Sequence, residues 1–136
     1  MSHTFSLRVY IEDTDAGGIV YHARYLNFLE RGRTEWLRTL GFEQQSLMGS
    51  QVQLVVRSLS CRFIRPARLD DALEVTTTVK GLSACAVTFD QQIDRKGEHL
   101  FSAEVDIACI DTERLRPTRW PGVLETALKN DLLTQP

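Results

Sequence analysis

The stretch Tyr10-Ile11-Glu12-Asp13-Thr14-Asp15-Ala16-Gly17-Gly18-Ile19-Val20-Tyr21-His22 joins a run with strand-like alternation to a run with helical spacing. It brings acids, a pair of glycines and a histidine together at this junction. A glycine pair lets the backbone approach a ligand closely, and the first N–H groups of a helix have no partner inside that helix. Such N–H groups polarise a bound carbonyl, and an acid aimed at the same carbonyl completes an acyl-transfer site.

The residues after this stretch predict a long amphipathic helix over 24–40. Apolar residues recur there at three- and four-residue steps, namely Tyr25, Leu26, Phe28, Leu29, Trp36, Leu37 and Leu40. Gly41 fits the left-handed position that closes such a helix. Gly32 lies in the middle of the helix, where glycine costs about 1 kcal/mol against alanine. We therefore expect Gly32 to allow close packing of the helix on a sheet.

The remainder of the chain has the period of strands. Runs rich in Val, Thr, Ile and Phe predict strands over 5–12, 51–65, 72–80, 84–93 and 100–111. Turn residues separate these runs, so we expect short connections and antiparallel neighbours. A short helical turn over 43–48 and a closing helix that begins at Pro121 complete the elements. The sequence therefore predicts an α+β fold, a five-stranded antiparallel sheet wrapped around one long helix, in a single domain over 1–136.

Composition limits the partners and the location of the protein. Sixteen basic and eighteen acidic residues give a formal charge of −2, which disfavours nucleic acid as the main partner. The amino terminus has no secretion signal and no run is apolar enough to span a membrane, so we expect a cytoplasmic protein. Cys61, Cys85 and Cys109 are odd in number and lie in apolar runs, which predicts buried free thiols.

Apolar strand faces predict that the chain associates with itself. We expect that one helix cannot fully cover strand faces such as Val75, Thr77 and Val79, or Cys85, Val87 and Phe89. We therefore expect at least a dimer.

Taken with Tyr25-Leu26 and Glu30-Arg31, the run from Tyr10 to His22 resembles the hotdog-fold acyl-CoA thioesterases associated with the Tol-Pal system, which are related to the 4-hydroxybenzoyl-CoA thioesterases. The resemblance extends over nearly the whole chain, through Arg65-Pro66-Ala67-Arg68-Leu69-Asp70-Asp71 and Arg116-Pro117. It implies a hotdog fold, dimers joined edge to edge into one sheet, tetramers of such dimers, and a site at the subunit interface. It also implies an acyl-CoA or acyl carrier protein substrate and no cofactor.

The resemblance assigns roles to residues of the opening stretch. It places the catalytic carboxylate at Asp15 and an assisting histidine at His22. Backbone N–H groups of Gly18, Ile19 and Val20 would bind the thioester oxygen. Apart from the resemblance, Tyr21 and Tyr25 flank the expected helix start, so they are candidates for lining an acyl pocket. Asp15 would either attack the carbonyl or take a proton from water. Without the resemblance, Asp15 fits a helix cap or an Asx-turn equally well, and Tyr25 fits helix packing.

Other polar residues have weaker assignments. Asp13 and Asp15 would lie on one side of an extended chain, but no second cluster of metal ligands accompanies them. We therefore predict no metal site and expect Asp13 to order the loop. Coenzyme A phosphates would find partners among the arginines, or these arginines are simply solvated; they are Arg57, Arg62, Arg65 and Arg68.

The sequence thus predicts an acyl-CoA thioesterase that releases a free acid and coenzyme A. One alternative is a noncatalytic scaffold that binds acyl thioesters or acyl carrier protein. Another is a hotdog hydratase or dehydratase, because different chemistries occur on one fold. Turnover of a thioester separates the first prediction from the scaffold.

Overall fold

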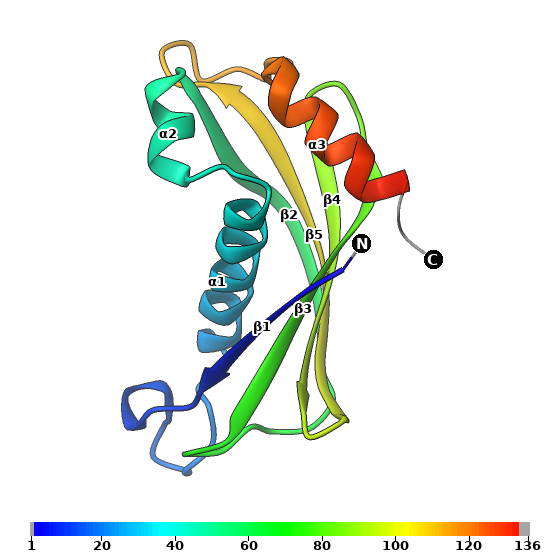
Figure 1. Ribbon diagram of the computed structural model, residues 1–136. Helices are drawn as coiled ribbons and strands as arrows, with labels where there is room; N and C mark the ends of the chain where they lie inside the picture. The colour runs from blue at the N-terminus through cyan, green and yellow to red at the C-terminus, as the bar shows by residue number, and fades with distance from the viewer. Residues whose placement is uncertain (1, 134–136) are drawn as a thin grey trace.

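The computed structural model describes residues 2–133 and places five strands in one antiparallel sheet. The elements, in chain order, are β1 (His3–Arg8), a 3-10 turn η1 (Ile11–Asp13), α1 (Arg24–Thr39), α2 (Gln44–Gly49), β2 (Val52–Phe63), β3 (Ala72–Leu82), β4 (Ala86–Arg95), β5 (Glu98–Asp111) and α3 (Gly122–Leu133). The sheet is curved, and α1 lies against one of its faces (Figure 1). No helix within residues 2–133 is long and apolar enough to cross a membrane.

The strand order is β1-β3-β4-β5-β2, which only partly follows the chain. The predicted antiparallel neighbours are confirmed for β3, β4 and β5, which turn back on each other in sequence. The prediction that β2 and β3 are neighbours was wrong. β2 instead pairs with β5 along its length, from Val52 opposite Asp111 to Phe63 opposite Phe101. The connection over 64–71 therefore runs from one edge of the sheet toward the other and contacts the first turn of α1 through Ala67 and Tyr25.

The first strand is shorter than the predicted 5–12. β1 ends at Arg8, and residues Ile11–Asp13 form a 3-10 turn. The carboxylate of Asp13 accepts a hydrogen bond of 2.8 Å from the Tyr10 N–H, which closes this turn. A side-chain acceptor placed three residues ahead competes with strand pairing, so the alternating pattern did not continue as a strand.

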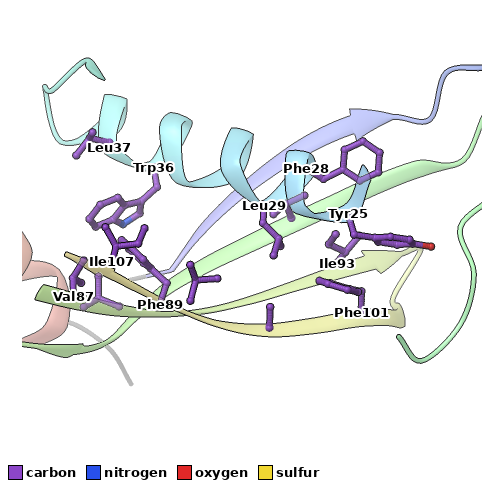
Figure 2. Close-up of a cluster of buried hydrophobic side chains, with 14 of the residues drawn as sticks. Tyr25, Phe28, Leu29, Trp36, Leu37, Val87, Phe89, Ile93, Phe101 and Ile107 are labelled. Carbon is purple, nitrogen blue, oxygen red and sulfur yellow. The ribbon is translucent and has the colours of Figure 1, made fainter. Parts of the chain in front are cut away.

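The face of α1 that meets the sheet carries the predicted apolar stripe. Its buried members include Tyr25, Phe28, Leu29, Trp36 and Leu37, several of which Figure 2 shows above Phe89, Ile93 and Phe101 of the sheet. The close approach expected at Gly32 is confirmed, because a Cβ added there would lie 2.7 Å from Cγ1 of Val75. Gly41 follows the helix with φ +90°, as predicted for its closing residue.

The sheet faces that were expected to need a second subunit are covered within the chain. Val75, Thr77 and Val79 are each 0% exposed, and Val87 and Phe89 are also buried. They face α1, because Gly32 packs directly on Val75 and Thr77. This argument for a dimer was therefore wrong, and exposed apolar residues lie on the edge strand β2 instead.

The three cysteines are free thiols, but they differ in burial. Cys109 is buried, and burial raises the pKa of its thiol to about 11. Cys85 is half-buried. Cys61 is exposed, so the prediction of a buried thiol was wrong there, since β2 is an edge strand without cover.

Candidate active site

The opening stretch folds into a tight hairpin before α1. Thr14 pairs with Val20 in an antiparallel bridge, and the Asp15 N–H donates to the Ile19 carbonyl at 2.9 Å. The Gly18 N–H donates to the Asp15 carbonyl at 3.0 Å, and Gly18 has φ +81°. A three-residue hairpin loop requires a residue in this left-handed conformation. The glycines therefore form a loop that holds Asp15 at the start of the turn.

Asp13 orders this hairpin through its side chain and its carbonyl group, as predicted. It is 4% exposed, and its side chain lies 3.7 Å from Nε of Arg24 in addition to its bond from Tyr10. Its carbonyl accepts a 2.9 Å hydrogen bond from the Tyr21 N–H. These contacts tie the hairpin to the first turn of α1. No group of three His, Cys, Asp or Glu side chains within residues 2–133 could hold a metal ion.

The connection over 64–71 docks against the other side of the hairpin. The Val20 N–H donates to the Ala67 carbonyl at 2.9 Å, and the Ala67 N–H donates to the Tyr25 hydroxyl at 3.1 Å. The Tyr25 ring stacks on Phe101 with 4.9 Å between ring centroids. Tyr25 thus packs in the core through its ring and holds the connection over 64–71 through its hydroxyl group.

A cavity of about 370 Å³, here called the site cavity, lies between the hairpin, α1 and the end of β2. Its lining includes Asp15, Ile19, His22, Tyr25, Phe63 and Arg65. The structure therefore brings together Asp15, His22 and Tyr25, which the sequence had proposed as a set. Asp15 and His22 are exposed at its mouth, and the His22 ring lies 4.4 Å from that of Tyr21.

The two carboxylate oxygens of Asp15 have different surroundings. Oδ1 accepts a 2.9 Å hydrogen bond from the Gly17 N–H, which is the Asx-turn geometry considered for this residue. Oδ2 has no hydrogen-bond partner within the part of the chain that the structure describes. The turn bond therefore fixes the carboxylate while one oxygen stays free for a ligand.

Two of the three backbone N–H groups proposed as donors already have partners within the chain. The N–H groups of Gly18 and Val20 are already engaged by the Asp15 and Ala67 carbonyls. α1 begins at Arg24, as the apolar spacing predicts, so the glycine pair lies in the hairpin before the helix and its N–H groups are not those of the first helical turn. Among residues 2–133, no partner is present for the N–H groups of Ile19 and His22. Of these two, the sequence had proposed only Ile19 as a donor.

The four arginines considered for phosphate binding are placed differently. Arg57 pairs with Asp106 at 2.8 Å on the sheet, away from the site cavity. Arg62 and Arg68 are exposed. Arg65 lines the site cavity and lies 3.4 Å from Glu98. Arg65 is therefore the arginine of this set that borders the candidate site.

Arg95 joins two carboxylates beside the site. Its NH1 lies 2.6 Å from Asp71 and 3.3 Å from the Pro66 carbonyl, and its NH2 contacts Glu98. Burial opposes ionisation of Asp71, but hydrogen bonds from Arg95 and from the Arg68 N–H hold its pKa below the usual range. The hydrogen bond from Arg95 likewise lowers the pKa of Glu98. This network holds the connection that lines the site cavity.

Replacing Arg95 with glutamine lowers Tm by a few degrees at neutral pH. Carboxylates with a lowered pKa stabilise the fold above about pH 4, and this stabilisation is lost as the pH falls through that lowered pKa. The difference in Tm between wild type and variant should therefore be largest near pH 7 and should shrink as the pH is lowered below about 4, as measured by thermal unfolding. Arg38→Gln, on an exposed helix pair, is the control. A difference independent of pH would contradict the role of Asp71 and Glu98.

The sheet, its apolar helix and a cavity that holds a free carboxylate oxygen beside open N–H groups define an α+β protein equipped for acyl transfer. The profile of the Thioesterase-like superfamily matches residues 9–128. The chain belongs to this superfamily, and the prediction that the protein is an enzyme of the thioesterase type is confirmed.

Individual relatives agree with this assignment. The acyl-CoA thioesterase YbgC of Haemophilus influenzae is 45% identical over 125 residues, which are 91% of this chain and 92% of the relative. A probable thioesterase from Bartonella henselae is 40% identical with a TM-score of 0.84, over 89% of this chain and 100% of that one. A 1,4-dihydroxy-2-naphthoyl-CoA thioesterase from Synechocystis has 25% identity and a TM-score of 0.90 over the full length of both chains. These likenesses confirm the family and the five-stranded hotdog architecture predicted from the sequence.

Proposed function

We propose that this protein hydrolyses acyl-CoA thioesters to a free acid and coenzyme A, with Asp15 as the reacting carboxylate. The observation that carries the proposal is the free Oδ2 of Asp15 at the mouth of a 370 Å³ cavity with apolar walls. The relatives in Haemophilus influenzae and Synechocystis are named as thioesterases that act on acyl-CoA compounds, which supports a thioester as the bond that this protein cleaves. Coenzyme A would remain toward solvent, where Arg65 borders the cavity.

The chemistry needs few groups, because a thiolate is a good leaving group. In one route the free oxygen of Asp15 attacks the carbonyl carbon, the C–S bond breaks to release the coenzyme A thiolate, and water then hydrolyses the mixed anhydride to the free acid and Asp15. In the other route Asp15 takes a proton from a water whose oxygen attacks the carbonyl carbon, and the C–S bond breaks to give the free acid and the thiolate. In both routes the thiolate takes up a proton to become coenzyme A. The open N–H groups of Ile19 and His22 would polarise the carbonyl oxygen, in place of the engaged N–H groups of Gly18 and Val20. The His22 side chain, at the same cavity, would handle a proton or orient the water.

Release of free thiol from a panel of acyl-CoA thioesters tests the proposal. The panel contains butyryl, octanoyl, palmitoyl and hydroxybenzoyl-CoA, together with one acyl carrier protein thioester. Turnover of at least one thioester is the expected result, and the ranking identifies the carrier and the acyl group. Binding without turnover would replace the enzyme by the noncatalytic acyl-binding scaffold.

We also propose that two copies join along β2 into one continuous sheet that wraps around both α1 helices. β2 is an edge strand of twelve residues, so its outer backbone groups are open to pairing. Four large apolar side chains of this strand are at least 36% exposed, namely Val55, Val56, Leu59 and Phe63, and Ile64 directly after it is 43% exposed. Because Phe63 also lines the site cavity, this edge would bring the second subunit beside the site.

Replacing Val55 with lysine should convert the dimer to a monomer. A lysine on the edge adds a charge that two antiparallel copies cannot bury together. Light scattering after gel filtration measures the mass. Val123→Lys is the matched control, because Val123 is 74% exposed on α3 and remote from β2 in the chain fold. A wild type of monomer mass would contradict the dimer, as would a Val55→Lys protein that keeps the wild-type mass.

A further inference from the structure

Two more cavities lie along the seam between α1 and the edge strand β2. The middle cavity has a volume of about 240 Å³ and the far cavity one of about 420 Å³. The middle cavity is lined by apolar residues that include Leu26, Leu29 and Leu59. The far cavity is lined by apolar residues that include Trp36, Leu37 and Leu54. Glu30, Arg33 and Val56 line both cavities and thus form the wall between them.

The site cavity and these two cavities follow one another in order along α1 and β2, although the site cavity and the middle cavity share no lining residue. Along α1, the three cavities use Tyr25, then Leu29, then Leu37. Figure 2 shows Tyr25 at one end of this helix and Trp36 with Leu37 at the other. Along β2, they use Phe63, then Leu59, then Leu54 in the opposite chain direction. An acyl chain that enters beside Asp15 would therefore run along this seam.

Arg33 is fixed at the wall by a buried amide. Its NH1 donates a 2.9 Å hydrogen bond to Oε1 of Gln91, which is only 2% exposed. The amide nitrogen of Gln91 donates to the Leu29 carbonyl at 3.0 Å and to Oγ1 of Thr77 at 2.9 Å. Both N–H donors of the amide are thus used, one on α1 and one on β3, and they fix the orientation of Oε1 toward Arg33. The Arg33 guanidinium cannot swing away without breaking this bond.

The guanidinium carries donors that an apolar chain could not satisfy. Arg33 forms no salt bridge within residues 2–133. Burial lowers the pKa of its guanidinium, and the nearby charge of Glu30 opposes this shift. A guanidinium has five N–H donors and stays protonated. An apolar tail pushed past it would remove water from a charge without replacing the hydrogen bonds, which is unfavourable.

We propose that the Arg33–Gln91 pair is a polar stop that sets the maximum acyl length, so that the substrates are short- and medium-chain acyl-CoA thioesters. This inference rests on the proposed function and specifies its substrate class. Tyr25 and Arg33 are eight residues apart, or about 12 Å along a helix. Each carbon of an extended chain advances by slightly less than a C–C bond of about 1.5 Å, so roughly eight to ten carbons fill the row up to the stop.

The first test compares kcat/KM for butyryl, octanoyl, dodecanoyl and palmitoyl-CoA. In the wild type, kcat/KM should fall sharply between octanoyl and palmitoyl. Arg33→Leu should raise the palmitoyl-to-octanoyl ratio at least about 10-fold, because it joins the middle and far cavities. Arg38→Leu is the matched control on the same helix, since Arg38 is exposed and pairs with Glu35 and Glu43; its ratio should equal that of the wild type.

A wild-type profile that is flat from octanoyl to palmitoyl would overturn the stop while leaving the thioesterase intact. The wild-type profile provides this answer even where Arg33→Leu fails to fold. An adipoyl-CoA preferred over hexanoyl-CoA by the wild type, and not by Arg33→Leu, would also overturn the stop. That result would make Arg33 the site for a carboxylate at the end of the acyl chain.

The second test measures binding without turnover, in proteins that also carry Asp15→Asn. Trp36 lines the far cavity, so a tail that reaches this cavity should change its fluorescence. Palmitoyl-CoA should change the emission when Arg33 is leucine and leave it unchanged when Arg33 is present. Equal changes in both proteins would overturn the stop. Because this readout needs no hydrolysis, it separates failure of the stop from failure of the proposed function.

Discussion

Replacing Asp15 with asparagine lowers kcat for acyl-CoA hydrolysis by at least about 100-fold, the usual minimum for loss of a catalytic acid or base. Asparagine has nearly the same shape and keeps an oxygen for the Gly17 N–H, so the hairpin should persist. It removes the charge on the oxygen that has no partner among the described residues. Both chemical routes need that charge, because neither attack on the carbonyl nor proton removal from water is open to an amide.

Thiol release under saturating substrate measures this effect. Glu12→Gln is the matched control, because it also removes an acid from the same stretch. The Glu12 carboxylate lies 3.8 Å from Arg24 and does not line the site cavity, so kcat should stay within about 3-fold of the wild type. An Asp15→Asn protein with more than about a tenth of wild-type kcat would remove Asp15 from the chemistry. Circular dichroism must show that both variants are folded.

The helices were largely predictable because their signals are local. The apolar spacing and the closing glycine predicted a helix over 24–40, and the observed α1 ends one residue earlier, at Thr39. Gly32 was informative for a different reason. A glycine disfavours a helix interior, so its presence indicates a neighbour that leaves no space for a Cβ, and Val75 is that neighbour.

The order of the strands could not be derived in the same way. β2 and β5 pair residues that are between 38 positions (Phe63 and Phe101) and 59 positions (Val52 and Asp111) apart, and no local pattern in either strand specifies the other as its partner. The turn residues between β2 and β3 indicate only that the chain bends. The path of the chain from β2 to β3 depends on the hydrogen bonds that buried Ala67 makes with Tyr25 and Val20.

The sequence could not show which N–H groups near the glycines are open, because one glycine pair fits two local structures. A glycine pair before a helix can be a helix entry or a hairpin loop, and here Gly18 closes a hairpin. The same turn explains why Asp15 accepts a local hydrogen bond and still presents an oxygen to the cavity. The Arg33–Gln91 contact joins residues 58 positions apart, and sequence reasoning had no signal for it.

Replacing Gly32 with leucine destabilises the fold by at least about 3 kcal/mol, at the upper end of overpacking effects in cores. The Cβ alone would lie 2.7 Å from Cγ1 of Val75 and 3.2 Å from Oγ1 of Thr77. Val75 is β-branched and fully buried, so it cannot rotate out of the way. A better helix former gains only about 1 kcal/mol, which does not offset the separation of α1 from the sheet.

Urea unfolding measures the loss, and we expect a fall in Tm of about 10 °C or more in parallel. Gly32→Ala should give a smaller loss than leucine, because the same Cβ contact is made without the longer side chain. Gly122→Leu is the control, since an added Cβ at Gly122 meets no atom within 4 Å. A Gly32→Leu protein as stable as this control would show that α1 can move off the sheet freely. In that case the seam between α1 and β2 could not hold Arg33 at a fixed place, and the proposed limit on acyl length would lose its structural basis.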